Sequence, residues 1–248
     1  MLLIILAAGY GARLYPGAEA IPKVLLDLDD GTTVLDMQLD AAKLSGIRRV
    51  WVVGGHRVEL IEEKAAQRID LDIQVIFNPF FDISNNLHSL WAARWVMDED
   101  FVVVNGDNVF HPAVLRELLS VAGSLVMTVS RKHVYDEDDM KVLLKGDRVL
   151  KVGKTLPAYE TNGESIGLVK FTDSGRDVLR DHLNTMVRSP QSRDMYWLAA
   201  LQAMMDTANI VNYYEVPSTA WAEIDYQSDL EFVRTNLWRF RHSEPSHD

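Results

Sequence analysis

The chain has 248 residues, of which 48% are hydrophobic and 25% are charged, and it contains no cysteine. This composition fits one globular α/β domain and excludes disulfides and thiolate metal sites, and it agrees with a cytoplasmic location. The formal net charge of −11 disfavours a general affinity for nucleic acids or acidic membranes, so an anionic ligand must be held by a few local cations.

Strands and helices are predicted to alternate through the first half of the chain. The apolar run Leu2–Ala7 predicts a buried strand rather than a signal peptide, because it is short and no basic segment precedes it. Hydrophobic periodicity then predicts a helix over 34–44, a strand over 48–55, a helix over 58–68, a strand over 73–77, a helix capped by Ser84 and a strand over 100–107.

The second half is predicted to contain a hairpin. Strands are expected over 124–132 and 165–171, and between them residues 140–152 reverse direction at Gly146-Asp147. Helices over 174–186 and 195–206, a strand over 210–216 and a helix over 229–239 follow. This order predicts an open, mainly parallel, Rossmann-like sheet with helices on both faces, in one domain over 1–241 with a flexible tail at 242–248.

The loop after the first strand, LAAGYGARLYPGAEAIPK, combines glycines with the cations Arg13 and Lys23. A glycine-rich turn after a buried strand presents backbone N–H groups to an anion, which suggests phosphate. The loop has Leu14 where a dinucleotide fingerprint needs its third glycine, and it lacks the Gly-Lys-Ser/Thr of a Walker A loop. We therefore expect a loop that folds over a triphosphate, with Lys23 neutralising the phosphate under attack. An ordinary loop with two solvated cations is the alternative.

Two later segments carry carboxylates in positions that suit a metal. In VVVNGDNVF, Asp107 follows a buried strand, where open α/β sheets bind their ligands. In WAEIDYQSDL, Glu223 and Asp225 occupy alternate positions of an extended segment, so they share one face. One of them can join Asp107 on Mg²⁺, which prefers oxygen ligands and is usually held by one or two carboxylates and substrate phosphates. The alternative is a turn residue and two unrelated surface charges.

These motifs resemble those of a known family. The pattern Leu-Ala-Ala-Gly-x-Gly-x-Arg-Leu at 6–14, followed by Pro22-Lys23, resembles the signature of nucleotidyltransferases that include sugar-1-phosphate nucleotidylyltransferases and MobA-like enzymes. The segments NPFFDISNNLHSLWAA, DEDDMKV, ESIGLVKF, MYW and EIDYQSDL are most similar to small cytidylyltransferases that activate phosphocholine or alkylphosphonates. The resemblance covers about residues 3–233 and implies a GT-A-like fold, with 1–130 mostly binding the nucleotide and 131–228 mostly binding the acceptor.

The resemblance implies transfer of CMP from CTP, or of a nucleotide from another nucleoside triphosphate, to a small phosphate or phosphonate, with release of pyrophosphate. The acceptor would be of the phosphocholine, 2-aminoethylphosphonate or hydroxyalkylphosphonate type. Arg13 and Lys23 would act in catalysis, Asp107 and Asp225 would hold Mg²⁺, and the segment SNNLHS would read the base. The implied nucleotide-binding residues are Leu6, Ala7, Ala8, Gly9, Gly11, Ala12, Arg13, Lys23, Gly55, Asn86, Ser89 and Asp107.

Residues for the acceptor are expected in the second half of the chain. The lysines Lys141 and Lys154 suit its phosphate or phosphonate. A quaternary ammonium would call for aromatic faces and a primary amine for carboxylates. The candidates are Tyr159, Tyr196, Trp197 and Trp221 for the former, and Glu164 and Glu223 for the latter. The acidic run 136–139 is either a solvated loop or a lid over an amine, and Trp197 is more typical of core packing.

Two departures from the relatives bear on the acceptor. No threonine shortly follows Arg-x-x-Pro, which disfavours a sugar phosphate, and Leu198 stands where phosphocholine-type members often place an acid, which disfavours choline.

The alternative functions are a sugar-1-phosphate or inositol-phosphate nucleotidylyltransferase that uses another nucleotide, a nucleotide-sugar-dependent glycosyltransferase, and a nucleotide-binding module. A glycosyltransferase would use a DxD metal motif, whereas this chain has GDNV. No segment marks an oligomer interface.

Overall fold

The structure is a computed structural model that describes residues 1–11, 13–14 and 20–241. Ala12 and the predicted tail at 242–248 lie outside the described residues. Among the helices within the described ranges, none is long and apolar enough to cross a membrane.

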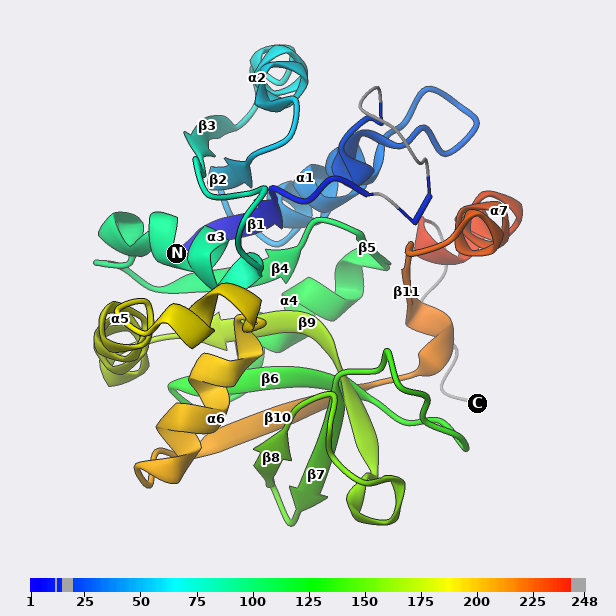
Figure 1. The fold of residues 1–248 in the computed structure, drawn as a ribbon. Helices are drawn as coiled ribbons and strands as arrows, with labels where there is room; N and C mark the ends of the chain where they lie inside the picture. Colours follow the sequence, from blue (N-terminus) through cyan, green and yellow to red (C-terminus); the bar gives the residue numbers. More distant parts are fainter. Residues whose placement is uncertain (12, 15–19, 242–248) are drawn as a thin grey trace.

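A nine-stranded sheet forms the centre of the molecule, with the strand order β3-β2-β1-β4-β9-β6-β10-β8-β7 (Figure 1). Its strands are β1 (Leu2–Ala7), β2 (Arg49–Gly54), β3 (Asp72–Phe77), β4 (Phe101–Asn105), β6 (Leu125–Ser130), β7 (Lys141–Lys145), β8 (Arg148–Val152), β9 (Gly163–Phe171) and β10 (Val211–Val216). Two short strands, β5 (Asn108–Phe110) and β11 (Trp221–Glu223), pair with each other outside this sheet.

The sheet is mixed and partly closed, so the prediction of an open, mainly parallel sheet is wrong in the second half of the chain. Strands β1 to β4 are parallel, but β9 runs antiparallel to both β4 and β6, and β8 runs antiparallel to β10. Strand β9 bends where Gly167 has a φ of +69° and where β6 shifts register between Met127 and Val129. The start of β9 thereby also pairs with β7, which closes strands β9-β6-β10-β8-β7 into a ring.

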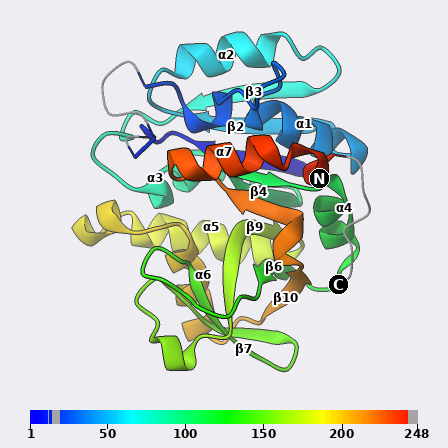
Figure 2. The same cartoon turned by 90° about the vertical axis from the view of Figure 1, so that its right-hand side faces the viewer.

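Helices cover both faces of the sheet, as predicted. Alternate side chains of β1 point to opposite faces: Leu3 and Ile5 join the core beneath α1 and α4, whereas Leu2 and Ile4 join the core beneath α3, α5 and α6. Figure 2 shows these two helical layers on either side of the strands. The helices are α1 (Val34–Leu44), α2 (Val58–Ala66), α3 (Asn86–Ala92), α4 (Pro112–Ser120), α5 (Ser174–Met186), α6 (Leu198–Asp206) and α7 (Gln227–Thr235).

Two helices match the predicted bounds, and the others differ at their ends. The predictions for α1 and α5 are confirmed at both ends, but α3 is capped by Asn85, whose side chain accepts from the amide of Asn86, rather than by Ser84. Helix α6 begins three residues later than predicted and α7 two residues earlier. Helix α4 was not predicted from the sequence, although proline in the first turn, here Pro112, commonly marks the start of a helix.

Gly167→Ala is expected to lower the free energy of unfolding by about 3 kcal/mol, whereas Gly146→Ala should cost only about 1 kcal/mol. Both glycines have positive φ, +69° and +63°, so both substitutions strain the backbone. Only at Gly167 would the new Cβ clash, because it would lie 2.3 Å from the side-chain nitrogen of Asn105; at Gly146 no described atom lies within 4 Å. Urea unfolding of both variants measures the difference, and equal losses would contradict the steric argument.

Candidate active site

A cleft of about 430 Å³ opens at the carboxyl ends of β1 and β4. Because these two strands are parallel and adjacent, the glycine loop after β1 and the turn after β4 emerge at the same edge of the sheet. The backbone amide of Gly106 donates to the carbonyl of Leu6 at 2.9 Å, which holds the two turns together. Of the residues predicted to bind the nucleotide, the cleft is lined by Leu6, Ala7, Ala8, Gly9, Gly11, Arg13, Lys23, Asn86, Ser89 and Asp107.

The two predicted metal ligands come together through strand pairing. Strand β11 runs antiparallel to β5, with Glu223 opposite Asn108. Just beyond this pair, the amide of Ile224 donates to the carbonyl of Asp107 at 3.0 Å. The side chains of Asp107 and Asp225, which lie 118 residues apart, therefore meet in the cleft, and both contact Lys23.

Lys23 and Arg13 are paired with these carboxylates. The Lys23 Nζ donates to Asp107 Oδ2 at 3.0 Å and to Asp225, and Arg13 donates to Asp225 Oδ2 at 2.9 Å. Burial disfavours the charged form of Lys23, but the two aspartates outweigh it and raise the pKa of the ammonium group. The cleft thus holds an ion-paired cluster at the position expected for a triphosphate and its metal.

Three carboxylates approach one another closely in this cluster. Oxygen atoms of Asp107, Glu223 and Asp225 all lie within 4.8 Å of one another. The Glu223 side chain is accessible to solvent but lies inside the cleft, where loss of bulk water and the charges of the two aspartates raise its pKa to about 8.

The donor set fits a hard divalent cation. Asp107 Oδ1 is buried and has no hydrogen-bond partner among the described residues. A Mg²⁺ ion here would give that oxygen a partner and relieve the repulsion between the carboxylates, and oxygen ligands are those it prefers. Glu223, predicted for the acceptor, belongs by position to this acidic cluster.

The residues predicted to read the base line the cleft from α3. Asn86 accepts a hydrogen bond from the backbone amide of Trp197 at 2.8 Å, and Ser89 accepts one from the side chain of Asn78 at 3.1 Å. These bonds fix both side chains without a ligand. Tyr10 also lines the cleft, and its ring centroid is 4.6 Å from that of His56. Tyr10 was not predicted, although it is an aromatic residue between the two loop glycines.

Two of the residues predicted for the acceptor line the cleft next to each other. The Lys154 Nζ lies 4.5 Å from the ring centroid of Tyr196. Trp197, expected to be packing, is 1% exposed in the core, and its indole nitrogen donates to Asn105 at 2.9 Å while its surface closes one wall of the cleft.

Four other predicted residues are not among the described residues that line the cleft. Lys141 is buried and donates to the backbone carbonyl of Lys154 at 2.8 Å. Glu164 pairs with Lys132 at 2.9 Å, and burial raises its pKa to about 7. Trp221 packs against the core, and at Gly55 a Cβ would lie 2.4 Å from that of Phe81. Lys141 and Gly55 thus lie next to residues that line the cleft, Lys154 and Phe81 respectively.

Comparisons with known proteins identify the family of this chain. Residues 3–164 match the model of the MobA-like NTP transferase domain. The CTP:phosphoglutamine cytidylyltransferase of Campylobacter jejuni is 27% identical over an alignment that covers 93% of this chain and 98% of that protein.

Two solved structures share the fold. The inositol-1-phosphate CTP transferase from T. maritima superposes with a TM-score of 0.80 at 24% identity, covering 96% of this chain and 95% of that one. The CTP:phosphocholine cytidylyltransferase from Streptococcus pneumoniae superposes with a TM-score of 0.77 at 20% identity, covering 95% and 99%. The chain belongs to the MobA-like NTP transferase family and is a nucleotidyltransferase.

Proposed function

We propose that this protein transfers CMP from CTP to a small phosphate or phosphonate, with Mg²⁺ as its cofactor and pyrophosphate as the second product. The observation that carries the proposal is the meeting of Lys23 and Arg13 with Asp107 and Asp225 in one cleft beside a glycine loop. The two cations can neutralise the phosphate oxygens of a triphosphate, and the two carboxylates can hold the metal bound to it.

The chemistry requires positioning and charge neutralisation. An acceptor oxygen attacks the α-phosphorus in line, a new P–O bond forms, and the bond to the β-phosphate oxygen breaks to release pyrophosphate. The nucleophile is already ionised, so no general base is needed. A Mg²⁺ held by Asp107 and Asp225 would withdraw charge from the phosphate oxygens.

Lys23 and Arg13 stabilise the charge that develops on the triphosphate. Both cations pair with the carboxylates proposed to hold the metal. If Asp107 and Asp225 hold the metal, Lys23 and Arg13 would lose these partners and would be available to contact the phosphates. The same cations that pair with the carboxylates would then neutralise the substrate.

The choice of CTP rests on the names of similar proteins and on Asn86 and Ser89, which line the cleft. The Campylobacter jejuni relative and the two solved structures described above carry CTP or cytidylyltransferase in their names. Asn86 and Ser89 line the cleft and offer hydrogen-bonding groups suited to the polar edge of cytosine. The acceptors named for those three proteins differ, and what they share is a small phosphorylated compound.

Pyrophosphate release tests the proposal. Each nucleoside triphosphate is combined with Mg²⁺ and with phosphocholine, 2-aminoethylphosphonate, a hydroxyalkylphosphonate, inositol phosphate or a sugar 1-phosphate. Release with CTP and one small phosphate or phosphonate is expected. Release only with another nucleotide and a sugar 1-phosphate would overturn the assignment of base and acceptor, and no release with any pair would overturn the proposed function.

A further inference from the structure

The acidic segment 136–139 is built to hold one carboxylate at the cleft. It lies between β6 and β7, and Asp136 Oδ1 accepts from the amides of Asp138 and Asp139 at 2.9 and 3.2 Å. Lys132 Nζ donates to Asp139 Oδ1 at 2.7 Å, which ties the turn to the body of the protein. Of the four acidic residues, Asp138 lines the cleft, so the segment is more than a solvated loop.

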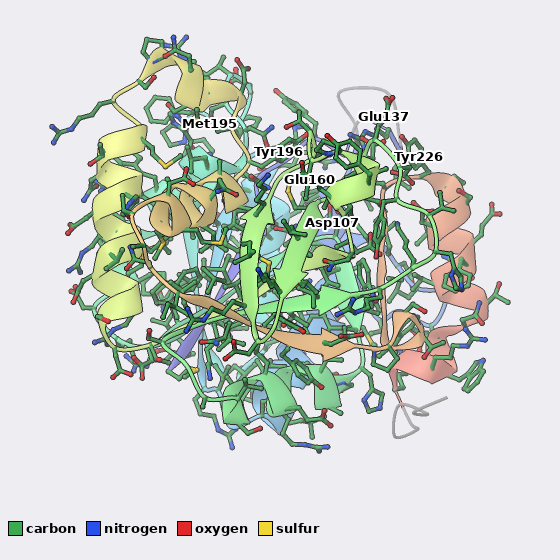
Figure 3. All side chains as sticks on the ribbon, turned by 90° about the horizontal axis from the view of Figure 1, so that it is seen from below. Asp107, Glu137, Glu160, Met195, Tyr196 and Tyr226 are labelled. Atoms are coloured by element: carbon green, nitrogen blue, oxygen red, sulfur yellow. The ribbon has the colours of Figure 1, made fainter. Side chains whose placement is uncertain are left out.

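Asp138 faces cations from both halves of the cleft. Its Oδ1 lies 3.7 Å from Arg13 Nη2 and 3.6 Å from Lys154 Nζ, and its Oδ2 accepts from the hydroxyl of Tyr226 at 3.3 Å. Figure 3 shows Glu137, the neighbour of Asp138, on the same side of the molecule as Tyr226. Both cation distances exceed a hydrogen bond, and the side chain is 53% exposed, so the carboxylate can accept a ligand.

The proposed reaction takes both cations away from Asp138. Arg13 moves to the triphosphate, and Lys154 is the lysine in the cleft wall that suits the acceptor's phosphate or phosphonate. Asp138 is then left facing the bound acceptor without its two positive neighbours. An anionic side chain in that position favours a cationic group on the ligand and disfavours a neutral or anionic one.

We propose that Asp138 binds a protonated amine of the acceptor, so that the acceptor is a small phosphate or phosphonate bearing a primary ammonium group. This inference rests on the proposed function. A primary ammonium donates hydrogen bonds to a carboxylate, whereas a quaternary ammonium needs aromatic faces. Of the four aromatic residues expected to surround a quaternary group, Tyr196 and Trp197 line the cleft, and Tyr159 and Trp221 are not among the described residues that do.

Matched acceptor pairs test this inference. 2-Aminoethylphosphonate and n-propylphosphonate have nearly the same size and differ in the ammonium group, as do phosphoethanolamine and propyl phosphate. With CTP and Mg²⁺, the ratio of kcat/KM for the amine over kcat/KM for the alkyl acceptor is measured in each pair. Asp138→Asn is expected to lower this ratio at least about tenfold, because a hydrogen bond to a charged group is lost.

Glu137→Gln is the matched control, since it removes the same charge from the neighbouring exposed position and should leave the ratio unchanged. A wild-type enzyme that prefers the alkyl member, or an Asp138→Asn variant that changes both acceptors by the same factor, would overturn the inference and leave the proposed function standing. An increase in kcat/KM for both acceptors would also overturn the inference, because Asp138 would then be competing with the acceptor's phosphate for the cations. Absence of pyrophosphate with every acceptor would overturn both.

Discussion

Lys23→Met is expected to reduce CTP-dependent pyrophosphate release by about 10²- to 10³-fold. Methionine keeps much of the side-chain length but removes the charge that stabilises the developing negative charge, and loss of one such group typically has this effect. The substitution also leaves Asp107 and Asp225 without their shared cation, so it should lower the Tm in the absence of metal. Mg²⁺ should restore part of that loss.

Lys43→Met is the control for Lys23→Met. Lys43 pairs with Asp70 at 2.8 Å on the surface, away from the cleft, so its loss should leave turnover unchanged. Circular dichroism in the presence of Mg²⁺ verifies that the Lys23 variant is folded. Turnover close to that of the wild type in a folded Lys23→Met variant would refute the role of Lys23.

Asp107→Asn is expected to weaken metal binding at least tenfold and to reduce turnover by about 10²-fold or more. Asparagine keeps the shape of the side chain but removes the charge, and Asp107 Oδ1 is a buried oxygen without a hydrogen-bond partner among the described residues. Electron paramagnetic resonance titration with Mn²⁺, with and without CTP, measures metal affinity independently of turnover.

Asp70→Asn provides the matched control, because it makes the same change at an exposed pair with Lys43 and Arg68. Its Mn²⁺ affinity and turnover should equal those of the wild type. An Asp107→Asn variant with unchanged Mn²⁺ affinity would show that the acidic cluster is not the metal site, whatever its turnover.

The core of the site was predictable because its parts follow buried strands. A continuous apolar run identifies β1 and β4, and the ends of adjacent parallel strands lie at one edge of the sheet. The glycine loop with Lys23 and the turn with Asp107 could therefore be expected to meet. Asp225 was harder, because its position depends on the three-residue pairing of β11 with β5, which is too short to predict from periodicity.

The remaining features depend on contacts that sequence spacing does not encode. Hydrophobic periodicity identifies β9 as a strand but not its direction, and its antiparallel pairing and the bend at Gly167 make the second half mixed and partly closed. Lys141 and Glu164 have suitable chemistry for binding an acceptor, but the pairing of β7 with β9 buries both of them. Asp138 could be identified only after the fold brought its loop to Arg13 and Lys154.

A crystal structure with CTP and Mg²⁺ bound tests the central claim most directly, namely that one cleft exchanges its internal ion pairs for a metal and a triphosphate. The account predicts Mg²⁺ on Asp107 and Asp225, with Lys23 Nζ moved from these carboxylates to the triphosphate and the cytosine against Asn86 and Ser89. A triphosphate bound elsewhere, or one bound here while Lys23 still contacts both aspartates and no metal lies between them, would contradict it.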